Sequence, residues 1–202
     1  MTNTNLKDFL RSRRSIRRFK PDVAPDSVLS DILYTATFAP SAHHRQPWRF
    51  AVIKDSSTKK HLADEMANAF ENDLRQDNLA QEEIQKLIAR SKSRINNAPV
   101  VILLCLDMTD MNPYQDKKRK RAEFLTAVQS VANAGMQLLL AAHAEGLGGV
   151  WVCSPIFAQE TVQRALELPT TWEPQAMFLI GYPAETPKTK ERKKIEEIVK
   201  FF

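Results

Sequence analysis

The sequence "KRAEFLTAVQSVANAGMQLLLAAHAE" (residues 120–145) carries apolar side chains at helical spacing over almost its whole length. Phe124, Val131 and Leu138 recur every seven residues on one face, and Leu139 lies among further apolar residues on the opposite surface. A helix that is apolar around much of its circumference is buried on several sides. The stretch therefore predicts a long helix at the centre of the hydrophobic core.

The segments around this helix indicate an α+β domain. Only a few strands are predicted against a larger number of helices, with connections too irregular for a repeating βαβ unit. No G-x-G-x-x-G opens a helix after a strand, so a Rossmann fold is not expected. We expect residues 1–202 to form one domain. The predicted strands are 48–53, 98–107, 149–153 and 176–181; the predicted helices are 4–12, 25–39, two within 58–95 separated by the polar "ENDLRQDN", 120–145 and 157–167.

Composition is that of an ordinary soluble protein. The chain has 202 residues, 43% of them hydrophobic and 26% charged, and a formal net charge of +5, which fits an anionic ligand without identifying it. Cys105 and Cys153 stand in apolar runs without metal-ligand spacing, so we expect two buried free thiols and no metal site. The first residues lack the apolar core of a signal peptide, and no uninterrupted apolar run approaches the ~20 residues that span a bilayer. We expect a cytoplasmic protein without a membrane partner.

The stretch "SRRSIRRFKP" (Ser12–Pro21) is the first functional signal. Together with Arg11 it places five arginines within eight residues, and residues 10–20 contain no Asp or Glu. Like charges this close repel, and a network of local ion pairs explains them poorly when no carboxylate is nearby. A guanidinium matches phosphate oxygens bidentately, and Ser15 adds a hydroxyl donor. The stretch predicts a phosphate site.

Two further segments indicate a ligand. "APSAHHRQPWRF" (residues 39–50) sets Ser41, His43 and His44 among other polar side chains between two prolines, a dense group of hydrogen-bonding residues suited to a planar heteroaromatic ligand. "AEGLGGVWVCSP" (residues 144–155) combines a helix-ending glycine with a glycine pair that leaves room for close backbone approach by a ligand.

Two other segments are basic. The tail "KTKERKKIEEIVKFF" (residues 188–202) is expected to be a solvated charged helix whose basic end could complete the phosphate site. The run "DKKRKRAEF" (residues 116–124) raises the alternative of a nucleic-acid or polyanion binder. Asp116 and Glu123 flank that run, however, and no aromatic residue is interleaved to stack on bases. A solvated helix start explains it better, and we expect no nucleic-acid partner.

Taken together, "RRSIRRF", "APSAHHRQPWRF", "EGLGGVWV" and "GYPAETP...RKKIEEIV" resemble the FMN-dependent nitroreductase family, in order and over nearly the whole chain. The "SAHH" pair, "SPIFAQETVQRALELPTTWEP" and "IGYPAE" are most similar to the subgroup that includes the nitroreductase-like C-terminal domain of bacterial coenzyme F420 γ-glutamyl ligase. The ligase half of that enzyme is absent. The resemblance implies an α+β fold with a central, mainly antiparallel sheet flanked by helices, assembled as an intertwined homodimer.

The resemblance also implies which residues hold FMN. By match, the first basic motif contributes Arg13, Arg14, Ser15 and Arg17; some of these side chains would hold the phosphate, and another would lie near the N1/C2 carbonyl edge of the flavin. A positive charge at that edge stabilises the reduced flavin. Ser41 would contact the flavin across a dimer interface.

Three more positions follow from the same match. The strand end Cys153–Ser154 corresponds to the backbone segment that hydrogen-bonds flavin N5. Arg192, with Lys193 or Lys194, corresponds to the C-terminal phosphate-binding position. The flavin itself carries the hydride, so no side chain is expected to act as a catalytic acid.

The family implies NADH or NADPH as the electron donor and a nitroaromatic, quinone or similar small molecule as the acceptor. His43, His44 and Asp73 are the candidates for contact with the acceptor. Asp73 falls where the F420-related subgroup contacts its long coenzyme, so a deazaflavin-binding or deazaflavin-reducing protein is an alternative.

Overall fold

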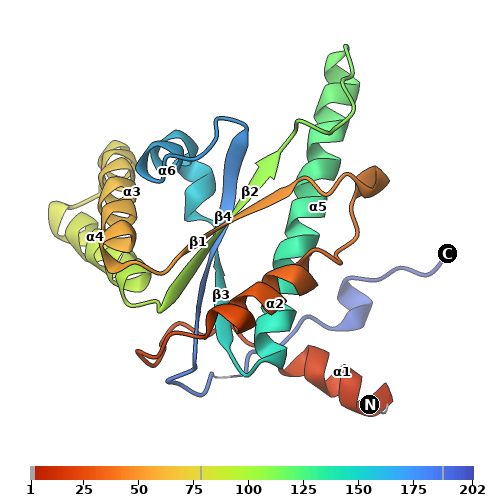
Figure 1. Ribbon diagram of the computed structural model, residues 1–202, viewed down its shortest axis with the longest axis horizontal. Helices are drawn as coiled ribbons and strands as arrows, with labels where there is room; N and C mark the ends of the chain where they lie inside the picture. The colour runs from red at the N-terminus through yellow and green to blue at the C-terminus, as the bar shows by residue number, and fades with distance from the viewer. Residues whose placement is uncertain (1–2, 78, 188) are drawn as a thin grey trace.

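The computed structural model of the chain describes residues 3–77, 79–187 and 189–202. Within these ranges four strands form an antiparallel sheet in the spatial order β1-β2-β4-β3 (Figure 1). The strands are β1 (Trp48–Ile53), β2 (Val100–Asp107), β3 (Gly148–Val152) and β4 (Trp172–Gly181). The predicted α+β class and antiparallel sheet are confirmed.

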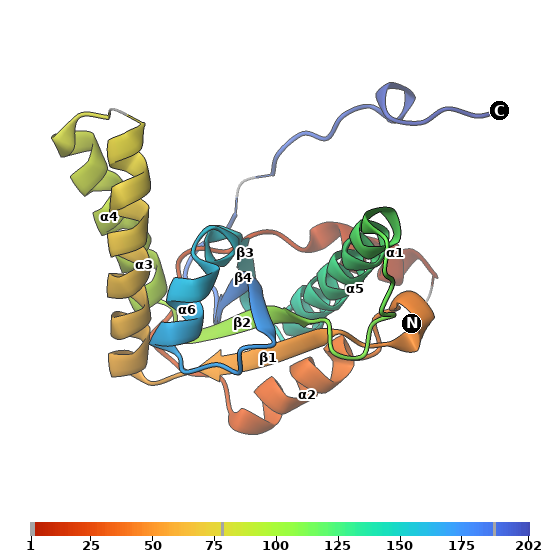
Figure 2. The same cartoon turned by 90° about the horizontal axis from the view of Figure 1, so that it is seen from above.

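Helices cover both faces of this sheet (Figures 1 and 2). One face packs against α2 (Asp26–Ala36) and α5 (Lys117–Ala144). The other packs against α3 (Ser56–Gln76) and α6 (Gln159–Ala165), while α4 (Gln81–Asn96) pairs with α3 as a helical hairpin. Helix α1 (Asn3–Ser12) extends away from this body in Figure 1, and the C-terminal tail does so in both views.

Strand β2 shows why the sheet is buried on both sides. Every residue from Val100 to Asp107 is buried. Ile102 and Leu104 join the cluster beneath α2 and α5, whereas Leu103 and Cys105 join the cluster beneath α3. Because successive side chains of a strand point to opposite faces, a continuous apolar run supplies both cores at once.

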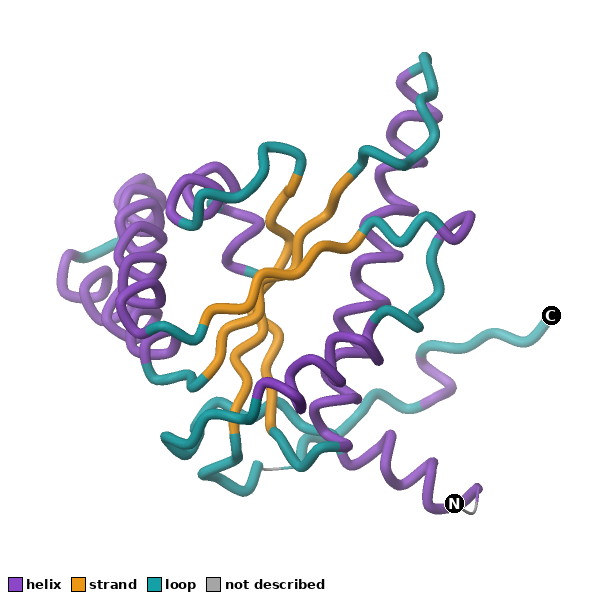
Figure 3. The backbone as a smooth tube through the Cα atoms, viewed as in Figure 1, coloured by secondary structure: helices purple, strands orange, loops and turns teal. Residues whose placement is uncertain are grey.

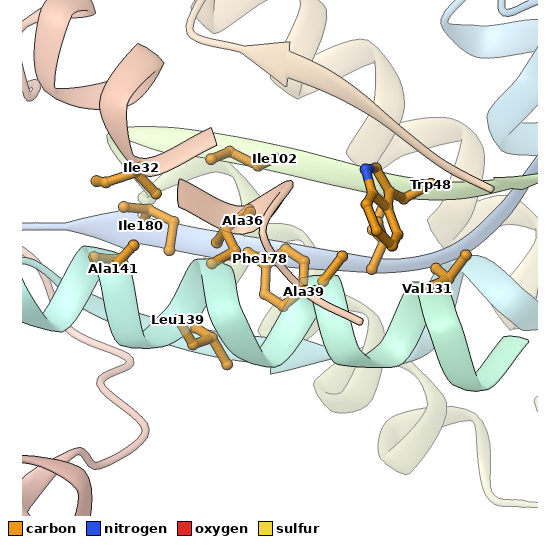
Figure 4. Packing of buried hydrophobic residues seen from close by; sticks show 14 of the residues in the cluster. Ile32, Ala36, Ala39, Trp48, Ile102, Val131, Leu139, Ala141, Phe178 and Ile180 are labelled. Carbon is orange, nitrogen blue, oxygen red and sulfur yellow. The ribbon is translucent and has the colours of Figure 1, made fainter. Parts of the chain in front are cut away.

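Helix α5 is the central core helix that the sequence predicts. Figure 4 shows it running beneath the sheet, with Val131, Leu139 and Ala141 among the packed side chains. By length and composition alone, α5 is also the one helix of the described chain that could cross a membrane, and 44% of its most apolar window is buried inside the structure. Its packing on the sheet accounts for the buried part of this apolar surface.

Gly135 allows α5 to approach the sheet closely. A Cβ atom at this position would lie 2.4 Å from Trp151 Cζ3, 2.8 Å from Phe178 Cζ and 3.0 Å from Leu104 Cδ2. Trp151 and Phe178 meet edge to face with ring centroids 5.0 Å apart, and Phe178 is completely buried, so the Phe178 ring has little free space to move into.

We therefore expect Gly135→Val to lower the free energy of unfolding by about 1–3 kcal/mol through overpacking. Chemical denaturation followed by far-ultraviolet circular dichroism measures the change. Arg121→Val, on an exposed turn of the same helix, introduces the same side chain without a clash and should change stability by less than about 0.5 kcal/mol. Equal stability of both variants with the parent would show that α5 does not pack this closely.

Three sequence predictions are wrong in detail. The polar stretch before Asn78 does not interrupt the hairpin, because α3 continues to Gln76 with Leu74 buried against Ile84 of α4. The helix expected from residue 157 begins at Gln159, since a 3₁₀ turn, η2 (Ser154–Phe157), precedes it. The tail is not a helix. Beyond residue 188 it contains only the 3₁₀ turn η3 (Ile195–Glu197), and Figure 3 draws the rest as loop.

The two cysteines also differ from one another. Cys105 is buried, as predicted, and burial followed by the nearby charge of Glu173 raises the pKa of its thiol to about 12. Cys153 is exposed, because β3 ends at Val152 and the chain leaves the sheet there. The prediction of a second buried thiol is therefore wrong.

Candidate functional site

The arginine-rich segment is fixed along the edge of the sheet. Ile16 N donates to Gly149 O at 3.1 Å, and Lys20 N donates to Tyr182 O at 2.8 Å. Ser15 forms an isolated bridge with the same glycine. These backbone bonds attach the segment to both β3 and the chain that follows β4. They fix the positions from which its side chains project.

The glycine pair serves this attachment. A Cβ on Gly148 would lie 2.7 Å from Ile16 Cβ, and a Cβ on Gly149 would lie 2.7 Å from Ile180 Cδ1 and 2.8 Å from Leu139 Cδ2. Protein side chains therefore fill the space that the sequence analysis assigns to a ligand at these glycines. Their absent side chains let the basic segment lie directly on β3.

Arg13 lies at the centre of a group of positive charges. Burial, and then the charges of Arg14 and Arg192, lower the pKa of its guanidinium below the ordinary value. Arg13 and Arg14 also line a cavity of about 320 Å³ together with Gly148 and Pro187. Arg13 thus lies in the electrostatic field of Arg192, a residue from the opposite end of the chain.

The arginines of this group differ in their partners. Arg14 folds back, its Nη1 donating to Arg13 O at 2.9 Å and to Arg11 O. Among the described residues no carboxylate lies within 4 Å of the Arg13, Arg17 or Arg192 guanidinium. Of these three residues Arg13 lines the 320 Å³ cavity, where its unpaired guanidinium is available to an anion.

His143 is a residue that the sequence analysis missed. Its ring stacks on Phe9 with centroids 5.0 Å apart, and Nε2 lies 2.8 Å from Ser12 Oγ. Burial and the charge of Arg13 lower the pKa of His143, which favours the neutral imidazole. This histidine lines the 320 Å³ cavity. It stands near the end of α5, whose sequence pattern is that of a core helix, and no local motif distinguishes it.

A second cavity of about 500 Å³ lies between the α3–α4 hairpin, the end of β3 at Val152, and the part of β4 that includes Met177 and Leu179. It is lined by Asp73 and Ser154, two of the predicted positions, and by Arg94. Burial, and then the charges of Arg90 and Arg17, lower the pKa of Arg94, so Arg94 lies in the electrostatic field of the first basic segment. The sequence does not single out Arg94, because this residue stands among the polar positions of the amphipathic helix α4.

Cys153 and Ser154 occupy the junction next to this cavity. Cys153 follows the last residue of β3, and its carbonyl accepts from Ile156 N at 3.1 Å inside the turn η2. Ser154 begins η2 and lines the cavity. In the C-terminal tail, Lys194 stands immediately before η3 and Lys193 precedes it in the sequence. Both lysines are exposed.

The loop of residues 40–47, here called the histidine loop, lies away from both cavities and against α5. Ala42 N donates to Ser130 Oγ at 3.0 Å, and Ser130 Oγ donates to Thr126 O at 2.7 Å. Ser41 Oγ accepts from Gln46 N at 3.1 Å. Neither of the two cavities is lined by Ser41, His43 or His44. Within one chain, the predicted residues thus fall into two separate groups.

The backbone of this loop is strained. His43, His44 and Gln46 have φ angles of 52°, 56° and 49°, in the left-handed region that non-glycine residues rarely adopt. Each such residue costs on the order of 1–3 kcal/mol and keeps this conformation only where its surroundings enforce it. The bond from Ala42 N to the buried Ser130 is one such enforcing contact.

Ser130→Ala removes this contact and leaves the Ala42 N–H without its acceptor. We expect a loss of about 0.5–1.5 kcal/mol in unfolding free energy, measured by chemical denaturation, because a partly buried donor loses its hydrogen bond. Ser93→Ala, an exposed serine of α4, is the matched control and should be nearly neutral. Unchanged stability of Ser130→Ala would mean that the loop holds its conformation without α5.

The run from Asp116 to Arg121 begins α5, as expected. The Asp116 side chain caps the helix by accepting from Arg119 N at 2.9 Å, and the Arg119 guanidinium lies 4.9 Å from the centre of the Tyr114 ring. Local partners therefore account for part of this charge run. Among the described residues no group of three or more His, Cys, Asp or Glu side chains could hold a metal ion.

Comparison with known proteins identifies the fold and the family. The model of the family described as "Nitroreductase family" matches residues 10–182. The Bacillus subtilis protein YfhC is 31% identical over 192 residues, which are 95% of this chain and 91% of YfhC. The NADH dehydrogenase of Thermus thermophilus is 29% identical, with 93% of this chain and 91% of that protein covered.

Solved structures agree. A BluB-like flavoprotein from Clostridium difficile has a TM-score of 0.82 at 24% identity, covering 98% of both chains. A nitroreductase-type protein from Desulfovibrio desulfuricans, solved in complex with FMN, has a TM-score of 0.74 at 27% identity and covers 100% of this chain and 98% of its own. These matches span the strands, the helices and the basic segments described above. The chain belongs to the nitroreductase family.

Proposed function

We propose that this protein is an FMN-dependent oxidoreductase that uses NADH or NADPH as electron donor. The observation that carries the proposal is the Arg13 guanidinium, which lines the 320 Å³ cavity in the electrostatic field of Arg192. Among the described residues, neither guanidinium has a carboxylate within 4 Å. The FMN complex of the Desulfovibrio desulfuricans relative and the NADH dehydrogenase of Thermus thermophilus support the choice of cofactor and donor.

The residues present fit FMN. Arg13 and Arg192, with Lys194 near by in the sequence, would hold the phosphate, which two guanidiniums bind more tightly than hydroxyl donors do. Arg17 and Arg94 would stabilise negative charge on the flavin ring from beside the 500 Å³ cavity. When bound, FMN supplies the hydride-transfer chemistry, and the protein supplies position and charge.

Arg14 and Ser15 contribute differently from the unpaired arginines. The Arg14 guanidinium donates hydrogen bonds to two backbone carbonyls of its own segment. We propose that it stabilises the conformation of this segment and adds positive potential to the site. Ser15 would offer its hydroxyl from a backbone that the sheet edge holds in place. The Cys153–Ser154 junction would contact the flavin ring through its backbone.

The functional molecule that we propose is a homodimer. Ser41, His43 and His44 are separated from the arginines and from Ser154 within one chain, and a second copy would bring them to the site. The proposed acceptor is a nitroaromatic, a quinone or a similar small molecule, and the cytoplasm is the proposed compartment.

Stopped-flow spectroscopy tests this function. We expect the purified protein to be yellow and its flavin absorbance to bleach on mixing with NADH or NADPH, then to return on mixing with a nitroaromatic or quinone. Comparison of the two donors under identical conditions defines the preference. A protein that stays colourless after incubation with FMN would rule out the proposal.

A narrower proposal is a role related to coenzyme F420. Its support is that Asp73, the position singled out by the F420-ligase resemblance, lines the same cavity as Ser154. Asp77 lines that cavity as well, and a second carboxylate disfavours an anionic glutamyl tail. Titration of the FMN-loaded protein with coenzyme F420 decides, and no binding at tens of micromolar would eliminate this role.

A further inference from the structure

The 500 Å³ cavity has an apolar floor and charged walls. Met66 and Leu74 from α3, Val152 from β3 and Met177 from β4 contribute to the floor. Most of the exposed surface in the cavity is therefore hydrocarbon, which suits a planar aromatic molecule.

The wall formed by the end of α3 is acidic. Asp73 and Asp77 line the cavity from positions one helical turn apart, and Asp77 N donates to Asp73 O at 3.2 Å, so the two carboxylates share one side of the helix. Like charges at this spacing repel. They also lie at the C-terminal end of the helix, where the backbone dipole already favours cations over anions.

No cation of the described chain compensates these carboxylates. Arg75, the basic residue of the last turn, pairs instead with Glu71 at 2.7 Å. Arg90 and Arg94 line the opposite wall, from α4, yet neither comes within 4 Å of Asp73 or Asp77. The cavity is thus negative on the α3 side and positive on the α4 side.

The two walls have different proposed partners. Arg94 lies in the field of Arg17, on the side assigned above to the electron-rich flavin ring. The acidic wall has no such partner. We propose that the acceptor is a planar aromatic molecule carrying a positively charged group, such as a protonated amine, which Asp73 and Asp77 bind. This inference rests on the proposed function and specifies its substrate class.

A matched series of nitrobenzenes tests the inference with the FMN-loaded enzyme. The probes are 4-nitrobenzylammonium, 4-nitrobenzyl alcohol and 4-nitrobenzoate, which share a ring and differ in charge. We expect kcat/KM to be on the order of tenfold higher for the cation than for the anion, because a pair of solvent-exposed charges gives a modest discrimination. The preference should weaken as ionic strength rises.

The variant Asp73→Asn/Asp77→Asn should lower kcat/KM for the cation by about three- to tenfold, raise it for the anion, and leave the alcohol unchanged. Comparing variant with parent for each probe cancels differences in intrinsic reactivity. Glu82→Gln/Glu83→Gln removes the same charge from the same hairpin outside the cavity, and should change none of the three values. FMN content and thermal stability of each variant verify its folding.

Binding gives a readout independent of turnover. The dissociation constant of 4-nitrobenzylammonium from the oxidised, FMN-loaded enzyme, measured by calorimetry without donor, should rise by the same three- to tenfold in the Asp73/Asp77 variant. Unchanged affinity and unchanged kcat/KM for the cation would overturn this inference. If flavin reduction by NADH or NADPH proceeds normally in that case, the proposed function stands, whereas absent reduction would refute the function itself.

Discussion

The variant Arg13→Ala/Arg17→Ala should lose its FMN. Each charge-assisted hydrogen bond contributes on the order of 1.5–3 kcal/mol, so removal of two guanidiniums corresponds to about a 10²–10⁴-fold rise in the FMN dissociation constant. Neither guanidinium has a carboxylate partner in the described chain, so the loss reflects the ligand rather than a broken ion pair. Flavin fluorescence, which increases as FMN leaves the protein, measures the constant.

The melting temperature should follow the flavin. A ligand at a hundredfold excess over its dissociation constant stabilises a protein by roughly 2.7 kcal/mol, equivalent to about 5–10 °C for a chain of this length. The variant should lose that increment at a fixed FMN concentration. The apoproteins of variant and parent should melt at similar temperatures.

Lys118→Ala/Lys120→Ala is the matched control. Both lysines are exposed in the first turn of α5, and the variant removes the same charge from the other basic run. It should retain FMN and melt like the parent. Equal FMN affinity in the arginine variant and in this control would show that the basic segment is not the phosphate site.

The fold was largely predictable because its signals are local. The apolar periodicity of α5 and the continuous apolar run of β2 each follow from residues adjacent in sequence. The errors occur where tertiary contacts decide. Leu74 keeps α3 helical through a polar stretch by packing on α4, whereas the described tail residues 189–202 are all exposed, so no burial holds a helix together there.

The site was predictable in part, for a different reason. Repeated arginines without acidic neighbours are unusual in themselves, so Arg13 could be singled out from sequence. Arg94 and His143 could not be singled out in this way. Arg94 stands among the polar positions of the amphipathic helix α4, and His143 stands in the core helix α5, so neither residue is unusual in its sequence context. Their placement beside Arg17 and Arg13 arises only when the hairpin and α5 pack on the sheet.

Apolar side chains remain uncovered on three elements that extend along one side of the molecule or away from it. On α5, Leu125 is 48% and Met136 43% exposed; on α1, Leu10 is 48% exposed. The tail presents Phe201 and Phe202 almost fully to solvent. Other elements also expose large apolar side chains, such as Tyr34 of α2 and Phe157 of η2. The elements α5, α1 and the tail, however, lie on one side of the molecule (Figures 1 and 2), and apolar groups exposed on one side are typical of an interface. A second copy of the chain is the occupant that would also join the histidine loop to the arginines.

Met136→Glu should therefore convert the protein to a monomer that no longer retains FMN. In a twofold-symmetric interface the substitution occurs twice, and each buried, unpaired carboxylate costs several kcal/mol, so the dimer dissociation constant should rise more than about 10³-fold. Sedimentation velocity, monitored at a protein wavelength and at a flavin wavelength, reports mass and cofactor together.

Ala89→Glu places the same charge on an exposed position of α4, on the far side of the sheet, and should leave a flavin-loaded dimer. Because Met136 lines neither cavity, FMN loss from this variant would follow from dissociation alone. A Met136→Glu monomer that sediments with one full FMN per chain would show that a single chain completes the site.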